Sequence, residues 1–344
     1  MMNKLKRLFN KIDGNTFLLI ITIVLFVVMY IIGMIVFKDK NFGRVQVFLN
    51  LFIGNAGLIV VAAGMTMVLI TGGIDISVGS VVAMVCMLLA WMMEIKGIGA
   101  IPALVIVLVV GIVFGFVQGW LVAYLKIQPF IVSLAGMFFA RGMTAIISTN
   151  MISIKNNTFL RWANAKFYLP IGAYTNKKGV VLESYIYPSV ILALLILAII
   201  FIMLKFTKFG RSIYAIGGNE QSALLMGLDV RKTKLKVYML NGLLCAFGGF
   251  LFCLNTCAGF VEQAKGFEME AIASSVIGGT LLTGGVGNVI GSLFGVLIKG
   301  TIETFITFQG TLSSWWTKIT IAALLAFFII LQSLFARAKT KKKN

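Results

Sequence analysis

The sequence predicts an all-α integral membrane protein that forms a single transmembrane domain over residues 1–344. Hydrophobic residues make up 60% of the chain, charged residues only 12%, and the mean hydropathy is +1.01, far from the composition of an average soluble domain. Many apolar runs have about 18 to 23 residues, the length that crosses a bilayer as a helix. Because these runs are continuously apolar instead of alternating with polar residues, the pattern excludes a transmembrane β-barrel.

We expect about ten membrane-spanning helices. The first apolar run is too long for the core of a signal peptide, so it is expected to remain as an uncleaved span. A polar stretch, residues 148–184, separates the fifth span from the sixth and is expected outside the cell. In chain order the expected spans are Thr16–Phe37, Leu49–Ile70, Val81–Met93, Ile101–Leu125, Phe130–Ile147, Tyr187–Leu204, Val237–Leu254, Glu270–Leu282, Val289–Phe305 and Trp315–Leu334.

Positive charge predicts the orientation of these spans. Cytoplasmic segments of membrane proteins carry an excess of lysine and arginine, and such residues cluster in both tails and in the loop 205–236. An even number of spans agrees with this distribution, so both termini are expected in the cytoplasm. Three cations disagree with it, because they fall in a loop that is expected outside: Lys38, Lys40 and Arg44.

Two spans are broken by glycine-rich polar segments, near residues 71–80 and 278–292. The segment Thr71-Gly-Gly-Ile ends four residues before the valine of a Val-Gly-Ser sequence. In the same way, Thr283-Gly-Gly-Val ends four residues before the isoleucine of an Ile-Gly-Ser sequence. This shared register predicts two related halves. At membrane depth, irregular or re-entrant backbone survives only where protein or a water-filled cavity surrounds it. Broken spans at corresponding positions therefore indicate a transport pathway, with close helix packing as the competing explanation.

Asp75 favours the pathway over plain packing. An ionisable group beside a membrane break usually marks a pathway or a partnered polar site. The candidate pathway residues are Gly72, Gly73, Asp75, Ser77, Gly284, Gly285 and Asn288.

Two series of glycines, each spaced four residues apart, indicate helix faces that other helices can approach closely: Gly111, Gly115 and Gly119, then Gly287, Gly291 and Gly295. The second series continues at the same spacing into Lys299 and Glu303, which places a cation and an anion within reach of each other. We expect a structural ion pair, because a mutual pair leaves little charge free to bind a substrate. Two further polar residues could line a cavity or lie near an interface: Arg141 and Asn241.

The loop 205–236 is the only long polar stretch in the middle of the chain and is expected in the cytoplasm. A short helix is expected from Glu220 to Met226, since Asn219 can cap its start and Gly227 can end it. About two turns are unstable alone in water, so the helix is expected to dock on another protein. A basic connector lying on lipid headgroups is the alternative. The docking residues would be Gly217, Gly218, Asn219, Glu220, Ala223, Leu224 and Gly227.

Missing residue types exclude several activities. The chain has no histidine, and its four cysteines lack metal-ligand spacing, so no metal site is expected. No Gly-x-x-x-x-Gly-Lys-Ser/Thr sequence occurs, so the chain is not expected to hydrolyse ATP through a P-loop, and no cofactor is expected. The net charge of +19 lies mostly in the tails and the central loop, which favours membrane topology over nucleic-acid binding as its explanation.

Four ordered stretches carry a resemblance to a known family: GGIDISVGS, QPFIVSLAGMFFARG, YAIGGNEQSALLMG and IGGTLLTGGVGNVIG. With them, nearly the whole chain resembles the permease subunits of bacterial sugar-importing ABC transporters of the ribose and galactose type. The stretches LAGMFFARG and GTLSSWWTKI are most similar to galactofuranose-type permeases.

The resemblance implies a ten-helix permease of the bacterial cytoplasmic membrane, paired with a second permease chain that is identical or different. It also implies a cytoplasmic ATPase pair and an extracytoplasmic sugar-binding protein. The short helix after Gly217-Gly218-Asn219 would be the coupling helix that docks on the ATPase, which makes 205–236 a cytoplasmic coupling loop. Alternatives are a secondary transporter or channel, a nucleoside or branched-chain amino-acid ABC permease, and, more remotely, a membrane-embedded enzyme.

Overall fold

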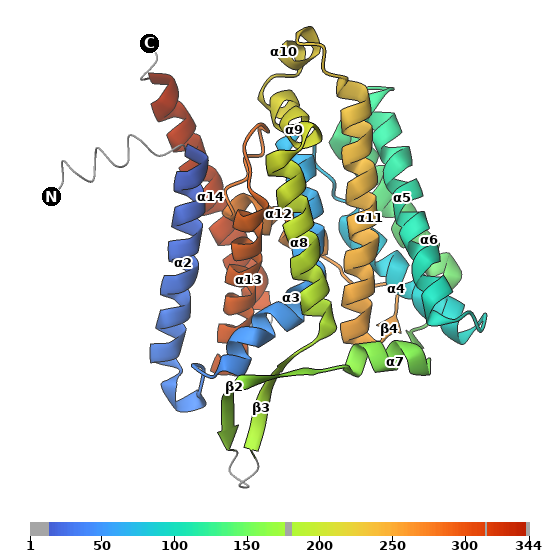
Figure 1. Ribbon diagram of the computed structural model, residues 1–344, viewed down its shortest axis with the longest axis vertical. Helices are drawn as coiled ribbons and strands as arrows, with labels where there is room; N and C mark the ends of the chain where they lie inside the picture. The colour runs from blue at the N-terminus through green and yellow to red at the C-terminus, as the bar shows by residue number, and fades with distance from the viewer. Residues whose placement is uncertain (1–13, 176–180, 314, 342–344) are drawn as a thin grey trace, which may run out of the picture.

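A computed structural model describes residues 14–175, 181–313 and 315–341, and helices dominate it (Figure 1). The all-α prediction is confirmed. The helices are α2 (Gly14–Val36), η1 (Lys38–Lys40), α3 (Val45–Ile70), α4 (Val78–Glu94), α5 (Ala100–Ala123), α6 (Pro129–Ile147), α7 (Asn157–Asn164), α8 (Pro188–Phe206), α9 (Lys208–Gly218), α10 (Glu220–Leu225), α11 (Val230–Thr256), α12 (Phe267–Ile277), α13 (Val289–Gln309) and α14 (Trp315–Lys341).

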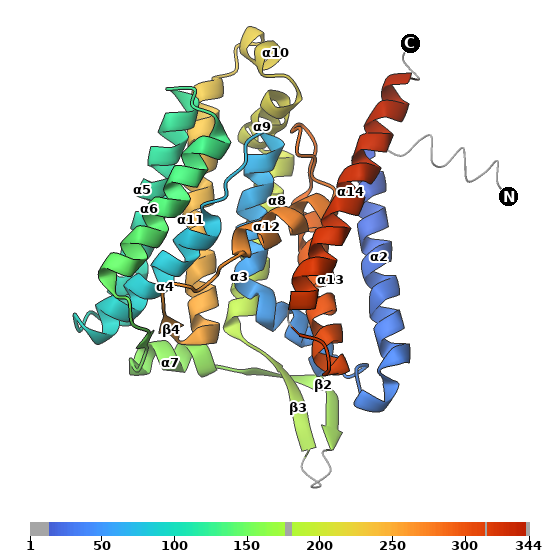
Figure 2. The same cartoon turned by 180° about the vertical axis from the view of Figure 1, so that it is seen from behind.

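Two small antiparallel sheets lie at one end of the molecule, opposite α10 (Figures 1 and 2). The strand β1 (Ile152–Ser153) pairs with β4 (Ala258–Gly259), and β2 (Phe167–Thr175) pairs with β3 (Val181–Ile186). With α7, three of these strands form the polar segment between α6 and α8. The start of α2 and the end of α14 lie at the other end, on the same side as α10.

Seven of the described helices are long and apolar enough to cross a membrane, and two shorter apolar helices, Val78–Glu94 and Trp315–Ile330, accompany them. One expected span differs. In place of Glu270–Leu282, the structure has the 11-residue α12, which ends at Ile277. A helix of this length rises about 16 Å, about half of the bilayer core. The chain leaves the helix at Gly278, where a side chain would collide with the backbone of Gly291.

The helix α3 forms the centre of the fold. It is enclosed by α8, α11, α12 and α13, and its side chains are buried without interruption from Asn55 to Ile70. By contrast, α2, α5 and α8 carry many exposed apolar side chains, as expected for surfaces in contact with lipid or a partner chain. The break after Ile70 therefore begins in the most protected part of the molecule.

Glycine permits a close contact between α5 and α11. A Cβ atom on Gly111 or Gly115 would lie 2.5 Å or 2.2 Å from a backbone oxygen of α11. The glycine series on α13 permits a similarly close approach of α12, since a Cβ on Gly295 would lie 1.9 Å from the carbonyl oxygen of Ser274. Both glycine faces are thus packing faces.

The three cations that disagree with the charge rule lie on or beside η1, at the end of the molecule opposite α10 (Figure 1). Two of them have partners there. The guanidinium of Arg44 lies 3.9 Å from the ring centre of Tyr174, and the ammonium of Lys40 donates a hydrogen bond to the carbonyl oxygen of Phe308. These contacts give Lys40 and Arg44 a structural reason to be at this end.

The α5–α11 contact predicts that Gly115→Val will lower the folded yield and the thermal unfolding midpoint. The added side chain must displace backbone of α11, a distortion of the kind that costs about 1–3 kcal/mol or more. Gly142→Val on α6 is the matched control, because its Cβ would meet nothing within 4 Å. Equal midpoints for the two variants would contradict the close contact.

Candidate functional site

The first break joins α3 to α4 through an acidic turn. The Oδ1 atom of Asp75 accepts hydrogen bonds from the backbone N–H and the hydroxyl of Ser77, at 2.9 and 2.6 Å. Gly72 lies in the left-handed region with φ +77°, a conformation that glycine adopts without steric cost. The two hydrogen bonds from Ser77 to the Asp75 carboxylate thus close the turn.

Neighbouring helices hold this turn from two sides. The Oδ2 atom of Asp75 accepts a hydrogen bond of 2.7 Å from the Nδ2 of Asn241 on α11, and the Nε2 of Gln118 on α5 donates to the Ser77 hydroxyl at 2.9 Å. All four side chains are buried, and Asp75 is only 3% exposed. Asp75 is therefore a partnered polar site, and Asn241 is its partner. Sequence reasoning had left the place of Asn241 open and had not considered Gln118.

The hydroxyl of Tyr238, on α11, lies next to this turn. The Oη atom of Tyr238 is buried and has no hydrogen-bond partner among the described residues. A Cβ on Gly73 would lie 2.7 Å from it. Glycine at position 73 therefore lets a polar group of α11 approach the break.

The second break joins α12 to α13 through a tight loop. The backbone N–H of Leu281 donates to the carbonyl oxygen of Val286 at 3.0 Å, and Gly284 and Gly285 have φ values of +86° and +75°. Asn288 ends the loop by capping α13, since its Oδ1 accepts a hydrogen bond of 2.9 Å from the N–H of Ile290.

The two breaks touch each other. The N–H of Gly285 donates a hydrogen bond of 2.8 Å to the carbonyl oxygen of Ile70 at the end of α3. A Cβ on Gly284 would lie 2.9 Å from the backbone nitrogen of Gly72. The sequence indicated two corresponding breaks, and the structure brings them into backbone contact.

A third segment, the end of α9, reaches the same point. A Cβ on Gly217 would lie 1.6 Å from the carbonyl oxygen of Ile70 and 2.5 Å from the nitrogen of Gly285. One turn earlier, the hydroxyl of Tyr214 donates a hydrogen bond of 2.8 Å to the carbonyl oxygen of Gly287. The helix that leads into α10 therefore lies against both breaks.

The helix α10 projects at the tip of the molecule (Figures 1 and 2). The Oδ1 of Asn219 caps it by accepting from the N–H of Ser222 at 2.8 Å, and Gly227 follows with φ +80°. Glu220 is tied to α11, because its Oε2 lies 2.6 Å from the Nζ of Lys234.

One expectation about α10 needs correction. Ala223 is not offered to a partner, because it is fully buried within this chain against Ile216 and Val230. A small side chain at this position lets α10 pack on α9 and α11. The exposed apolar side chains are those of the next three residues: Leu224 is 64% exposed, Leu225 89% and Met226 68%.

A charged cluster lies deep between α3, α12 and α13. The Nζ of Lys299 is 2.6 Å from a carboxylate oxygen of Glu303 and 3.1 Å from one of Glu270. It also donates a hydrogen bond of 3.2 Å to the Oδ1 of Asn55. The expected neighbours Lys299 and Glu303 lie together, but the cation has a second carboxylate that sequence spacing did not indicate, since Glu270 belongs to another helix.

Among the described residues, no group of three or more histidine, cysteine, aspartate or glutamate side chains could hold a metal ion. The site consists of closely packed backbone segments and buried hydrogen bonds. Two interrupted membrane helices, packed against a basic loop with an exposed tip, define a membrane transport protein.

Comparison with known proteins gives the family. Residues 47–329 match the family described as "Branched-chain amino acid transport system / permease component". The chain is 43% identical over 314 residues to the inner membrane ABC transporter permease protein YjfF of Escherichia coli, with 91% of each chain covered. It is 34% identical to the fructose import permease protein FruG of Bifidobacterium longum, covering 94% of this chain and 92% of the relative.

Identity to the ribose import permease protein RbsC of Escherichia coli is 32%, over 90% of this chain and 92% of the relative. No solved structure matches. The chain therefore belongs to this family of ABC transporter permeases. Its members are multi-pass membrane subunits rather than enzymes, and they work with ATPase and substrate-binding partners.

The Asp75–Asn241 hydrogen bond predicts the outcome of an exchange experiment. Asp75→Asn replaces a charge-assisted hydrogen bond with a weaker one between two neutral amides, and Asn241→Asp turns two carboxylates toward each other, so each single change lowers the thermal unfolding midpoint. The double exchange restores one donor and one acceptor and recovers most of the loss. Additive losses in the double variant would show that the two side chains do not interact.

The cluster at Lys299 predicts a second set of outcomes. Lys299→Gln leaves two partly buried carboxylates without a cation and costs about 1–3 kcal/mol, more than Glu303→Gln, which leaves the pair with Glu270 intact. Adding Glu303→Gln to Lys299→Gln recovers only part of the loss, whereas adding Glu270→Gln as well recovers most of the folded yield. Full recovery in the double variant would contradict the role of Glu270.

Proposed function

We propose that this chain is the permease subunit of an ATP-binding-cassette importer for a monosaccharide. It would form the translocation pathway and couple to a separate ATPase. The class of substrate is supported by two relatives that are named as fructose and ribose import permeases. Galactofuranose, galactose and ribose are the sugars that the sequence motifs favour.

One observation carries the coupling role: the contact of Gly217 with both breaks. The exposed tip of α10 is joined to α9 by one residue, and α9 ends against Ile70 and Gly285. Because Ala223 and the Glu220–Lys234 pair fix α10 to its neighbours, a push on the tip would move α9 as well. ATP-driven closure of the ATPase would thereby shift the broken helices and alternate access to the pathway.

The pathway in this proposal runs beside the two breaks. Its residues are those that the sequence singled out, and their backbone groups and hydrogen bonds would form its polar lining: Gly72, Gly73, Asp75, Ser77, Gly284, Gly285 and Asn288. The proposal is supported by the hydrogen-bonded Asp75 turn and by the unpartnered Tyr238 hydroxyl beside Gly73. A buried hydroxyl without a partner is costly, and a sugar hydroxyl would pair with it once the two breaks move apart.

The proposed topology has ten crossings in two related halves, in which α4, α14 and the segment made of α12 and the loop after it join the seven long apolar helices. Both termini and α10 would lie in the cytoplasm, and α7 with the two small sheets would lie outside. This orientation is supported by the basic loop 205–236 and by the structural partners of Lys40 and Arg44 at the opposite end. The membrane is the bacterial cytoplasmic membrane.

The partners follow from the same assignment. A cytoplasmic ATPase would dock on α10, a sugar-binding protein would deliver substrate outside, and a second identical or different permease chain would complete the pathway. Lipid would cover the remaining apolar faces. The description of the matching family names branched-chain amino acids, so an amino acid of that class is the second candidate substrate.

The docking role predicts that Leu225→Glu abolishes ATPase co-purification and uptake while the permease reaches the membrane in normal amount. Leu225 is 89% exposed, so the charge does not disturb folding but opposes burial in an apolar interface. Met151→Glu is the matched control, because it adds the same charge to an exposed apolar side chain next to β1.

Retention of the ATPase and of uptake by Leu225→Glu would refute docking at this tip. Accumulation of substrate by the permease alone, driven by an ion gradient, would move the chain to the secondary-transporter class.

A further inference from the structure

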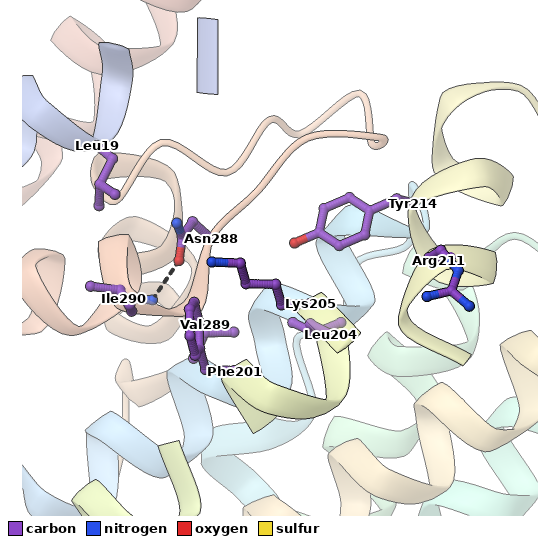
Figure 3. Close-up of a pocket in the computed structure, with 9 residues that line it drawn as sticks. All are labelled: Leu19, Phe201, Leu204, Lys205, Arg211, Tyr214, Asn288, Val289 and Ile290. Carbon is purple, nitrogen blue, oxygen red and sulfur yellow. Dashed lines mark hydrogen bonds between the residues drawn. The ribbon is translucent and has the colours of Figure 1, made fainter. Parts of the chain in front are cut away.

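A pocket of about 610 Å³ opens between α2, α8, α9 and the start of α13. Apart from Asn288, which borders the second break, its lining residues have no part in the steps proposed above. Its lining residues are Leu19, Phe201, Leu204, Lys205, Arg211, Tyr214, Asn288, Val289 and Ile290 (Figure 3).

The lining of the pocket has an apolar part and a polar part. Leu19, Phe201, Leu204, Val289 and Ile290 are apolar, and the remaining four side chains are polar or cationic. Figure 3 shows the side chain of Lys205 extending toward Asn288, whereas Arg211 lies on the other side of Tyr214. Among the described residues, neither cation has an ion-pair partner.

The position of the pocket matches a membrane interface. Lys205 stands in the last turn of α8, a candidate membrane span, where the apolar helix gives way to the basic loop. The first turn of α13, whose dipole favours negative charge, also borders the pocket. Basic pockets between membrane helices at this depth bind the headgroups of anionic lipids.

We propose that this pocket binds the phosphate headgroup of an anionic phospholipid such as phosphatidylglycerol. Lys205 pairs with the phosphodiester, and Arg211 adds positive charge on the other side of Tyr214. Asn288 and Tyr214 lie beside the glycerol hydroxyls, and the acyl chains run along α2 and α8. Both helices carry exposed apolar side chains beyond the pocket, among them Val24, Val28, Leu195 and Ile199. The apolar part of the lining favours a lipid over free phosphate.

The site lies next to the contact between α9 and the second break. Tyr214 borders the pocket and also donates to the carbonyl oxygen of Gly287. A bound lipid would therefore brace α9 against the loop that it contacts.

The test measures lipid retained by the full chain purified from membranes that contain phosphatidylglycerol and phosphatidylethanolamine, by native mass spectrometry. The double variant Lys205→Gln/Arg211→Gln should retain roughly tenfold less phosphatidylglycerol, with phosphatidylethanolamine unchanged. Lys208→Gln is the matched control, since this residue begins α9 but does not line the pocket, and it should retain as much as the unmodified chain.

A photoreactive phosphatidylglycerol provides a second measurement that needs no substitution. It should label peptides within residues 201–214 and 288–290 of the unmodified chain, and millimolar inorganic phosphate should not reduce the labelling. Equal retention by the double variant and the control, labelling confined to other segments, or displacement by inorganic phosphate would each overturn the proposal.

Discussion

The connection between the tip at α10 and the two breaks depends on one backbone contact, at which the end of α9, the end of α3 and the loop after α12 meet. Gly285 donates its N–H to the carbonyl oxygen of Ile70, and Gly217 lies so close that a Cβ would fall 1.6 Å from the same oxygen. No side chain separates the three segments, so displacement of one must move the others or break the contact. This rigidity would transmit a displacement of α10 to the interrupted helices.

Paired polar groups hold the rest of the interior in place. Asp75 and Lys299 would each be expensive as isolated charges at membrane depth, and each has one local partner and at least one from another helix. Ser77 in the same turn and Asn241 on α11 bind the aspartate, and Glu303 on the same helix, Glu270 on α12 and Asn55 on α3 bind the lysine. These contacts link α3, α11, α12 and α13. The same groups that fix the helices therefore also determine which parts can move together.

Local features could be predicted from sequence, and contacts between distant segments could not. Continuous apolar runs predicted the helices, the repeated Thr-Gly-Gly register predicted the breaks, and spacing placed Lys299 beside Glu303. The burial of Ala223, the contribution of Glu270 and the meeting of Gly217 with Ile70 depend on how helices far apart in the chain pack. The end of α12 at Ile277, ahead of the expected Leu282, has the same origin, because it is set by the close approach of α13 at Gly291.

Two adjacent glycines allow the most direct test of the coupling contact. A methyl group on Gly217 collides with the carbonyl oxygen of Ile70, whereas a methyl group on Gly218 meets nothing within 4 Å. Uptake per ATP hydrolysed should therefore be compared for Gly217→Ala and Gly218→Ala in the assembled transporter. The account predicts that Gly217→Ala assembles and hydrolyses ATP but loses most of its uptake, and that Gly218→Ala behaves like the unmodified chain. Normal uptake per ATP in assembled Gly217→Ala would contradict it.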